Sequence, residues 1–386
     1  MLPAALSALL FHSFQGAPAL ESDLAAAVQA RLEAFVTAGR VPGVSAGLVL
    51  SDGTELALAA GLADRELEKP LRAEDRLCGG SSGKTFVAAV TLQLVEEGKL
   101  GLDDFLGEYL GAEPWFERLP NASEITIAHL LGHRTGIQRH EFDPKFMQAV
   151  LAAKDRVWKP AEMVAYILDR APSFEAGSGF LYSDTNFVLV GMVIEKLTEN
   201  SLYAEVQRRL LEPLELTGVR PQDSRSLPGL VQGYLGANNP FGAPERSLEP
   251  DGRFMLNPQF EWAGGGFVAN GGTLAHWAKA LYAGSVLKPE TRARMVASLE
   301  APELGRGMRY GLACENWPSP RGTCWGHAGF FPGYLTEMRY WPEHGTAVAV
   351  QVNTSEYAAL PRTLGELCEE LLGVALADSE KDGLPR

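Results

Sequence analysis

The sequence predicts an α+β fold in which strands from both chain ends form one antiparallel sheet flanked by helices, with an α-helical lobe inserted between them. Residues 44–49 and 55–60 flank Ser51-Asp52-Gly53-Thr54 as a hairpin, and strand-like runs return over residues 309–352. The intervening residues 100–217 show mostly helical periodicity, interrupted by loops that carry Pro and Gly. Strands at the two ends around a helical middle indicate one shared sheet.

The length of 386 residues is typical of two or three domains, and 46% hydrophobic residues can bury a large core. The shared sheet favours a single domain over residues 20–386. Its α/β lobe would comprise about residues 20–99 and 257–386, and its helical and loop-rich lobe about residues 100–256. We expect the functional site in the cleft between these lobes.

The net charge of −14, from 34 basic and 48 acidic residues, argues against a general surface for nucleic acid or anionic membrane. No later stretch has the roughly 18 uninterrupted apolar residues of a membrane span. Residues 1–19 form a possible signal peptide, because Met1–Phe11 is apolar and Ala17-Pro18-Ala19 offers small residues for cleavage. The segment lacks Lys and Arg before its apolar part, so a frayed N-terminus is the alternative to export to the periplasm or medium.

The first half of the chain contains a predicted helix over residues 24–37 and a hairpin of strands 44–49 and 55–60. A further helix begins at Ser81, with apolar residues at helical spacing and Gly98 as its stop. In the middle of the chain, helical periodicity predicts helices over residues 161–169 and 187–198.

Residues 218–256 are rich in loops, and the glycine-rich run that follows precedes a predicted helix over residues 274–282. We expect these glycines to permit close backbone approach, with Thr273 or Asn270 as the helix cap, because no basic residue is present to meet a phosphate. The remaining elements are strands over residues 309–314, 323–327, 335–341 and 346–352 and a helix over residues 364–374.

The four cysteines are too few and too scattered for a zinc site or a disulfide framework, so no metal is expected. Cys314 and Cys324 lie symmetrically about Pro318-Ser319-Pro320. They could form a disulfide across a hairpin, or remain two buried thiols.

The run Ser81-Ser82-Gly83-Lys84 is an S-x-x-K motif at the start of a helix. Its Ser and Lys lie one turn apart, with their Cβ atoms roughly 5–6 Å from each other. A lysine can take the proton of a serine nucleophile only when it is itself neutral, which requires its pKa of about 10.4 to fall by about 3 units. The helix dipole acts in that direction.

Two other interpretations compete for this motif. Gly79–Thr85 approaches the phosphate-binding pattern G-x-x-x-x-G-K-[ST], but it is one residue short, because Cys78 stands where the first glycine should be. The simplest alternative is a capped helix start with a solvated lysine.

Two further signatures follow in order, Tyr182-Ser183-Asp184 before an apolar helix and His327-Ala328-Gly329 at a strand end. With the S-x-x-K motif they resemble the serine β-lactamase and penicillin-binding superfamily, most closely its class C-like branch of D,D-peptidases, D-aminopeptidases and family VIII esterases. Its signatures are S-x-x-K, Y-x-N and K-T-G or H-x-G. Residues 125–137 and Gly264–Thr273 add support, and the resemblance spans roughly residues 25–375. The ordered set is specific, although each motif alone is weak.

The resemblance implies that Ser81 is the acylated nucleophile, Lys84 its proton acceptor and Tyr182 a second acid and base for the leaving group. It also implies that His327 lines the cleft and polarises Tyr182 or the substrate. The backbone N–H groups of Ser81 and Phe330 would form the oxyanion hole.

Gly329 would leave room for the substrate beside its strand, as the family pattern implies. Asp184 departs from the family's Asn, and its carboxylate could pair with Lys84, raise the pKa of the lysine and hinder it as a base, or bind a substrate ammonium. Ala328 and Phe330 lack the hydroxyl groups that help to hold a substrate carboxylate in β-lactamases and D,D-carboxypeptidases.

Phe330, Phe331 and Tyr334 are expected to form an apolar substrate-binding wall that favours uncharged acyl groups. Arg306 or Arg309 could still bind a substrate carboxylate. The sequence thus predicts a metal-free serine hydrolase without a cofactor that acts through an acyl-enzyme on a small ester, amide or peptide. Esterase and D-amino-acid peptidase or carboxypeptidase activities come first, and β-lactamase activity is an alternative.

An alternative of another class is a catalytically idle protein that binds peptidoglycan fragments or a protein partner. A permanently protonated, ion-paired Lys84 would favour it. An ATPase built on the phosphate-loop pattern is a third option, but no apolar strand that ends in a Mg²⁺-binding Asp accompanies the motif.

Overall fold

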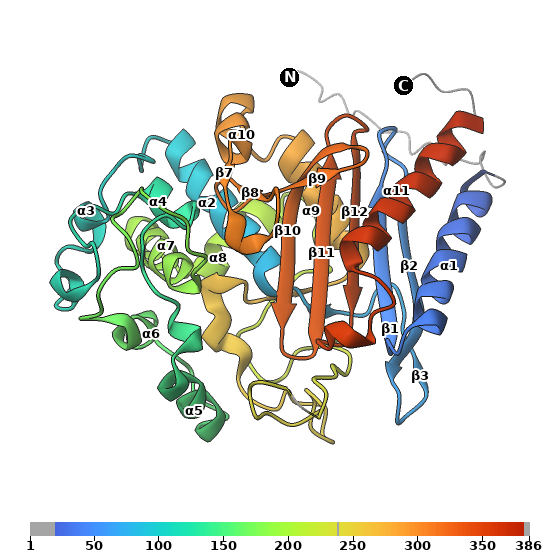
Figure 1. The fold of residues 1–386 in the computed structure, drawn as a ribbon, viewed down its shortest axis with the longest axis horizontal. Coiled ribbons are helices and arrows are strands. Elements are labelled where there is room, and N and C mark those ends of the chain that lie inside the picture. The colour runs from blue at the N-terminus through green and yellow to red at the C-terminus, as the bar shows by residue number, and fades with distance from the viewer. Residues whose placement is uncertain (1–19, 238, 382–386) are drawn as a thin grey trace, which may run out of the picture.

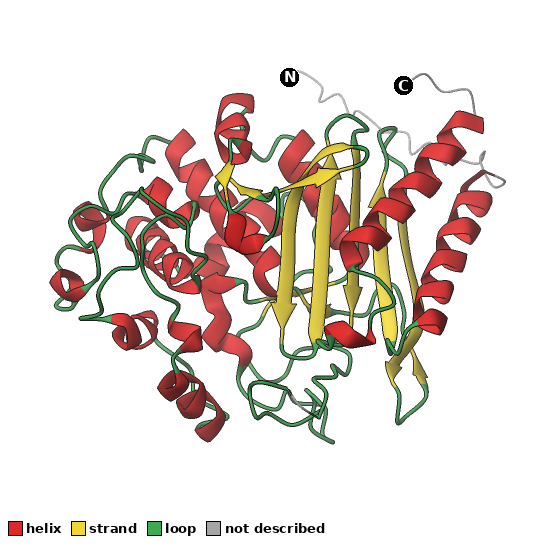
Figure 2. Ribbon diagram, viewed as in Figure 1, coloured by secondary structure: helices red, strands yellow, loops and turns green. Residues whose placement is uncertain are grey.

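The computed structural model describes residues 20–237 and 239–381, so the predicted signal peptide, residues 1–19, lies outside the described residues. A nine-stranded sheet of order β3-β2-β1-β12-β11-β10-β9-β8-β7 forms one side of the molecule (Figures 1 and 2). Its N-terminal strands are β1 (Gly43–Val49), β2 (Glu55–Asp64) and β3 (Lys69–Pro70). The others are β7 (Leu299–Glu300), β8 (Arg309–Tyr310), β9 (Glu315–Ser319), β10 (Gly322–Phe331), β11 (Tyr334–Trp341) and β12 (Thr346–Val352).

The two chain ends meet where β1 pairs with β12 in antiparallel register, with Val44 opposite Val352. Every residue of both strands is buried. Helices α1 (Leu20–Ala38) and α11 (Leu364–Lys381) cover one face, and α9 (Gly271–Ala283) covers the other (Figure 1). Burial on both faces explains why β12 is a nearly continuous apolar run. The predicted α+β fold with a sheet from both ends is confirmed.

The inserted segment forms a helical lobe beside the sheet (Figure 1). Its long helix α7 (Asp184–Thr198) packs in the core against α2 (Lys84–Glu96), which precedes the inserted segment. Shorter helices surround them: α3 (Leu106–Leu110), α4 (Ile127–Leu131), α5 (Pro144–Ala152), α6 (Pro160–Val164) and α8 (Leu202–Val206). Residues 100–217 are all described and contain no strand, as the sequence predicts.

A second, small sheet joins the two parts of the molecule. It has the order β4-β6-β5 and consists of β4 (Leu77–Cys78), β6 (Phe267–Ala269) and β5 (Arg220–Pro221). Because β4 pairs with β6, the chain that enters the S-x-x-K turn lies beside the chain that leaves the glycine-rich run. Helix α9 then begins after Asn270, whose side chain accepts a hydrogen bond from the Thr273 N–H at 2.9 Å, which confirms one of the two predicted caps.

Two predicted elements are shorter in the structure. The helix predicted over residues 161–169 ends as α6 at Val164 and continues only as a 3₁₀ turn to Ile167. The strand predicted over residues 309–314 breaks after Tyr310, because Ala313 has a φ of +54° and its N–H donates to the carbonyl of Leu131 instead of a neighbouring strand. Helix α10 (Pro289–Val296) precedes this region.

All four cysteines carry free thiols, so the disulfide alternative for Cys314 and Cys324 is wrong. The β9–β10 ladder places Cys324 opposite Trp317. The turn is therefore not centred on Ser319, and the two cysteines do not face each other. Among residues 20–237 and 239–381, no helix has both the length and the apolar character needed to cross a membrane.

Candidate active site

Ser81 lies in a 3₁₀ turn, Gly80–Gly83, that leads directly into α2. Gly80 has a φ of +53°, which favours glycine, and the turn presents Ser81 at the edge of a pocket. Lys84 follows one turn later, and its Nζ donates a hydrogen bond to Ser81 Oγ at 2.9 Å. The local spacing of the S-x-x-K motif therefore brings the two groups together as predicted.

The Lys84 ammonium is fully buried and lies against three oxygen atoms, two of which accept hydrogen bonds from it while the third forms an ion pair. Besides Ser81 Oγ, these are the Gly264 carbonyl oxygen and Asp184 Oδ1, each at 2.5 Å from Nζ. Burial alone would lower the pKa of Lys84, but the Asp184 carboxylate outweighs it and raises the pKa above its usual value. We therefore assign a protonated ammonium to Lys84, not the neutral amine that a lysine base requires.

The same contacts argue against the phosphate-loop alternative. A phosphate-binding lysine reaches outward to its ligand, whereas Lys84 points inward to protein oxygens. The glycine-rich run has a structural role instead. A Cβ at Gly83 would lie 2.5 Å from the Gly265 oxygen, so only glycine lets this backbone approach α2 and deliver the Gly264 carbonyl to Lys84.

Asp184 is the first residue of α7, where the positive end of the helix dipole stabilises a carboxylate. Burial would raise the pKa of Asp184, but Lys84 and Arg139 dominate and lower it. Asp184, which replaces the family's Asn, therefore forms an ion pair with Lys84. This is one of the two roles that the sequence predicts for Asp184.

Tyr182 lies two residues before α7 and is only 7% exposed. Lys84 Nζ lies 5.0 Å from the centre of its ring. Within the described part of the chain, the Tyr182 hydroxyl has no hydrogen-bond partner. Burial raises the pKa of Tyr182 to about 12, although the charge of Lys84 acts in the opposite direction. The phenol is therefore protonated and available to donate its proton.

His327 does not line the pocket, contrary to the expectation from the family pattern. It is fully buried, and its Nδ1 lies 2.6 Å from the Ala328 carbonyl oxygen. Because a carbonyl only accepts, Nδ1 carries the proton and Nε2 accepts from the Tyr310 hydroxyl at 2.9 Å. Burial and Lys84 lower the pKa of His327 to about 3, so the ring is neutral. It packs edge-on behind Tyr182, with ring centres 6.1 Å apart.

Strand β10 passes immediately beside the Ser81 turn. A Cβ at Gly329 would lie 2.0 Å from the Gly79 oxygen, and a Cβ at Gly80 would lie 2.6 Å from the Phe330 nitrogen. These two glycines bring the backbones of Ser81 and Phe330 to the same side of the pocket. The arrangement is compatible with the oxyanion hole predicted from their N–H groups, which stays a prediction.

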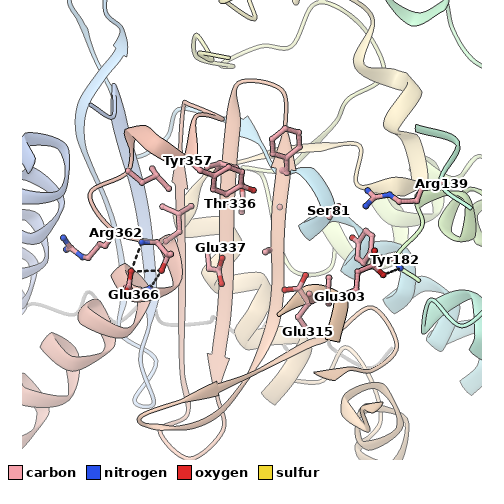
Figure 3. Close-up of a pocket in the computed structure, with 18 residues that line it drawn as sticks. Ser81, Arg139, Tyr182, Glu303, Glu315, Thr336, Glu337, Tyr357, Arg362 and Glu366 are labelled. Carbon is pink, nitrogen blue, oxygen red and sulfur yellow. Dashed lines mark hydrogen bonds between the residues drawn. The ribbon is translucent and has the colours of Figure 1, made fainter. Parts of the chain in front are cut away.

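The pocket beside Ser81 has a volume of about 740 Å³ and extends across β10 and β11 to the start of α11 (Figure 3). Phe330 and Gly329 line it, but Phe331 and Tyr334 do not. Phe331 is 3% exposed and stacks on Phe260, because successive residues of a strand point to opposite faces.

Tyr334 is fully buried, and its hydroxyl lies 2.8 Å from Ser247 Oγ. The expected apolar wall of three aromatic residues is therefore reduced to Phe330. Neither arginine considered for binding a carboxylate lines the pocket, and Arg309 instead bonds to Ser298.

Sequence reasoning missed several charged residues around the Lys84–Asp184 pair. Arg139 lines the pocket and pairs with Glu141 at 2.6 Å. Burial raises the pKa of Glu141 to about 7 and that of Glu261, near Lys84, to about 8. Glu303 and Glu315 also line the pocket. No local motif marks these residues, because only the folded chain brings them to the site.

The fold and site define a class of α+β proteins in which a serine and a lysine at a helix start face a tyrosine beside an antiparallel sheet. The family model described as Beta-lactamase matches residues 28–367, and the chain belongs to this family. The resemblance to the serine β-lactamase and penicillin-binding superfamily is thereby confirmed.

Three relatives illustrate the range of the family. The crystal structure of a D-stereospecific amidohydrolase from Streptomyces sp. matches with a TM-score of 0.75 at 29% identity, over 89% of this chain and 97% of that chain. Penicillin-binding protein 4 of Amycolatopsis lactamdurans is 25% identical over 368 residues, or 91% of each chain. Lovastatin esterase of Penicillium rubens is 28% identical over 274 residues, or 65% of this chain and 66% of the esterase.

Proposed function

We propose that the protein is a serine hydrolase that forms a covalent acyl-enzyme at Ser81 on a small ester or amide. The main observation in support is the 2.9 Å contact between Ser81 Oγ and Lys84 Nζ at the edge of a 740 Å³ pocket. The buried side chain of Tyr182 lines the same pocket. The similarity to an amidohydrolase and to an esterase supports hydrolysis of these bond types. Neither a metal nor a cofactor takes part in the proposed reaction.

Acylation begins when Lys84 and Tyr182 together have lost one proton, since both are protonated in the resting site. Ser81 passes its proton to this pair while Oγ bonds to the substrate carbonyl carbon. The N–H groups of Ser81 and Phe330 hold the oxygen that becomes negative. Tyr182 then protonates the leaving nitrogen or oxygen as its bond to carbon breaks.

Deacylation repeats these steps with water. A water molecule attacks the acyl carbon and gives a proton to the Lys84–Tyr182 pair, and the pair returns a proton to Ser81 Oγ as the ester bond breaks. The products are a carboxylic acid and the free serine. One proton is carried in each half-reaction, so the site is restored at the end.

The site supports ester and amide substrates better than β-lactams or peptides with a terminal carboxylate. Ala328 and Phe330 offer no hydroxyl to an anion, and Arg139, the arginine nearest Tyr182 in the lining, is already paired with Glu141. D-Amino-acid amides are therefore included among the proposed substrates, following the similarity to the D-stereospecific amidohydrolase.

The test is covalent labelling with a fluorophosphonate, read by intact mass, together with turnover of p-nitrophenyl acetate and D-phenylalanine p-nitroanilide. We expect wild type to gain one adduct, and Ser81→Ala to lose both the adduct and turnover while keeping the circular dichroism spectrum of wild type. Ser178→Ala, which removes a hydroxyl far along the chain from Ser81, should label normally. Equal labelling of Ser81→Ala would identify another nucleophile.

The Lys84–Asp184 ion pair also favours a second candidate, a catalytically idle protein that binds peptidoglycan fragments or a partner. A fixed ammonium cannot act as a base. In that case wild type would remain unlabelled and inert at every pH, yet would bind muropeptides in calorimetry. Export is a separate proposal that rests on residues 1–19, and the mass of the protein recovered from periplasm or medium tests it.

A further inference from the structure

One arm of the pocket runs from Tyr182 over the exposed face of β10 and β11 to the start of α11 (Figure 3). This arm is strongly acidic. Four glutamates line it: Glu303, Glu315, Glu337 and Glu366. Figure 3 shows Glu303 and Glu315 close to Tyr182, and Glu337 further across the sheet.

The strand register explains why two of these glutamates border the same surface. Ala328 on β10 pairs with Glu337 on β11, and Gly326 on β10 pairs with Glu315 on β9. Gly326 and Ala328 are two residues apart, so they share a face with both partners. Because glycine and alanine are small, the floor between the two glutamates stays open.

The positive charges in the lining are already neutralised. Arg139 pairs with Glu141 at 2.6 Å, and Arg362 pairs with Glu370. Glu337 is itself bound to Arg339 at 2.8 Å. Two carboxylates of this arm lie closest to Tyr182 and form no ion pair with Lys or Arg. Glu303 Oε2 accepts a hydrogen bond from the Tyr182 N–H at 3.2 Å. Glu315 lies beside His327, which is neutral.

The Tyr182 hydroxyl supplies an independent indication that a ligand belongs here. Its side chain lines the arm, is more than nine-tenths buried and lacks a hydrogen-bond partner within the described residues. Leaving a buried hydroxyl without a partner is unfavourable, and a ligand atom at this position would supply the missing hydrogen bond. In the proposed reaction that atom is the leaving group, so the leaving group lies at the acidic end of the arm.

We propose that this arm binds a positively charged leaving group, so that the substrates are esters or amides of a cationic amino alcohol or amine. Glu303 and Glu315 are the residues that select the charge. This inference rests on the proposed function, because it takes Tyr182 as the proton donor to the leaving group. It also implies that a leaving group with a carboxylate, such as a terminal amino acid, is rejected.

The experiment compares three butyrate esters that differ only in the leaving group. Butyrylcholine carries a positive charge, 3,3-dimethylbutyl butyrate has the same shape without the charge, and the butyrate ester of 3-hydroxypropanoate is anionic. We expect kcat/KM to favour the choline ester over the neutral ester by about tenfold or more, and the anionic ester to be the poorest.

Glu303→Gln, and Glu315→Gln above pH 8, should each reduce this preference several-fold, measured as the ratio of kcat/KM for the choline ester to kcat/KM for the neutral ester in the same variant. Glu290→Gln, at the exposed start of α10, is the matched control and should keep the full preference. Equal rates for the choline and neutral esters in wild type would overturn the inference. So would a preference that neither variant reduces.

The charge of Glu315 adds a pH signature. Burial raises the pKa of Glu315 to about 8. The charged and titratable groups that act on Glu315 are His327 on β10, Glu337 and Arg339 on β11, and Lys84 on α2. The groups on which Glu315 acts are the thiol of Cys314 and the hydroxyls of Tyr182, Tyr282, Tyr310 and Tyr357. The effect of Glu315→Gln should therefore grow as the pH rises through about 8.

Failure of this inference and failure of the proposed function give different results. If the neutral ester is hydrolysed by wild type but not by Ser81→Ala, the serine mechanism holds whatever the charge preference. If no ester is hydrolysed and fluorophosphonate does not label the protein, the proposed function is wrong and the inference falls with it.

Discussion

Asp184 is the residue whose chemistry changes this site most relative to the family pattern. Its carboxylate lies 2.5 Å from Lys84 Nζ, and the pairing raises the pKa of Lys84. Acylation needs the Lys84–Tyr182 pair to lose one proton, so the ion pair moves activity to higher pH. The residue at the second position after Tyr182 thus sets the pH range of the proposed reaction.

The substitution Asp184→Asn tests this assignment. It removes the carboxylate but leaves Lys84 buried, and burial lowers the pKa of a lysine. We expect the rising limb of the kcat/KM profile against pH to move by at least about one unit to lower pH, with about tenfold faster labelling at neutral pH. Asp169→Asn, at an exposed ion pair with Arg118, is the control. An unmoved limb in the Asp184 variant would remove the ion pair from the mechanism.

The ion pair also makes a prediction about stability. Replacing Lys84 by Met leaves the Asp184 carboxylate, whose side chain is only 19% exposed, without its main partner, which should destabilise the protein by about 3 kcal/mol. The double variant Lys84→Met with Asp184→Asn should recover most of that loss and remain inactive. Urea unfolding of the four proteins in the cycle gives the coupling energy.

The sign of the pH dependence provides a second readout of the same pair. The native pKa of Asp184 is lowered, so its stabilisation is present above the unfolded value of about 3.9 and is lost as pH falls through the native pKa. Wild type should therefore lose more stability than the double variant on acidification below about pH 4. Parallel losses would show that the pair contributes nothing to folding.

At the scale of single elements, local patterns predicted most of what the structure contains. The spacing of Ser81 and Lys84 was enough to predict their contact, because residues one helical turn apart lie on the same face. The apolar run of β12 was predicted with its bounds, Thr346–Val352. The prediction that Phe330 and Phe331 face the same pocket was wrong, since it ignored the alternation of strand side chains.

Contacts between elements that are distant in sequence could not be predicted from the sequence alone. Nothing near Glu261 or Glu141 shows that folding brings them to the Lys84–Asp184 pair. The position of His327 behind Tyr182 also depends on the β8–β9 and β9–β10 registers, which together place Tyr310 against its ring. The order of the motifs was enough to indicate the family. The charged residues around the nucleophile could be identified only from the folded structure.

The close approach of strand β10 to the Ser81 turn can be tested by a substitution on that strand. Gly329→Val puts a Cβ 2.0 Å from the Gly79 oxygen, so β10 must shift away and the site must open. We expect fluorophosphonate labelling to fall by about 100-fold or more, because the Phe330 N–H leaves its position. Gly107→Ala on α3, where a Cβ makes an ordinary 3.4 Å contact with Phe116, should label normally. Normal labelling of the Gly329 variant would contradict the assigned role of this strand.

At the scale of the whole molecule, the site exists only where the lobes meet. The helical lobe contributes Tyr182 and Asp184 at the start of α7, and the sheet contributes Gly329 and Phe330 on β10. The S-x-x-K turn lies between them, tied to the glycine-rich run by the small sheet. Residues far apart in sequence are held by packed elements on three sides, so the polar groups are positioned before a substrate arrives.

The net charge of −14 and the acidic arm of the pocket act together on a charged substrate. Raising the ionic strength from about 0.01 M to 0.15 M shortens the screening length from about 30 Å to about 8 Å. We expect kcat/KM for butyrylcholine to fall several-fold over this range, because attraction to an acidic surface accelerates encounter and strengthens binding. The neutral 3,3-dimethylbutyl ester should be hydrolysed at a constant rate, and Glu303→Gln should flatten the response to butyrylcholine. The same salt dependence for both esters would show that charge plays no part in substrate capture.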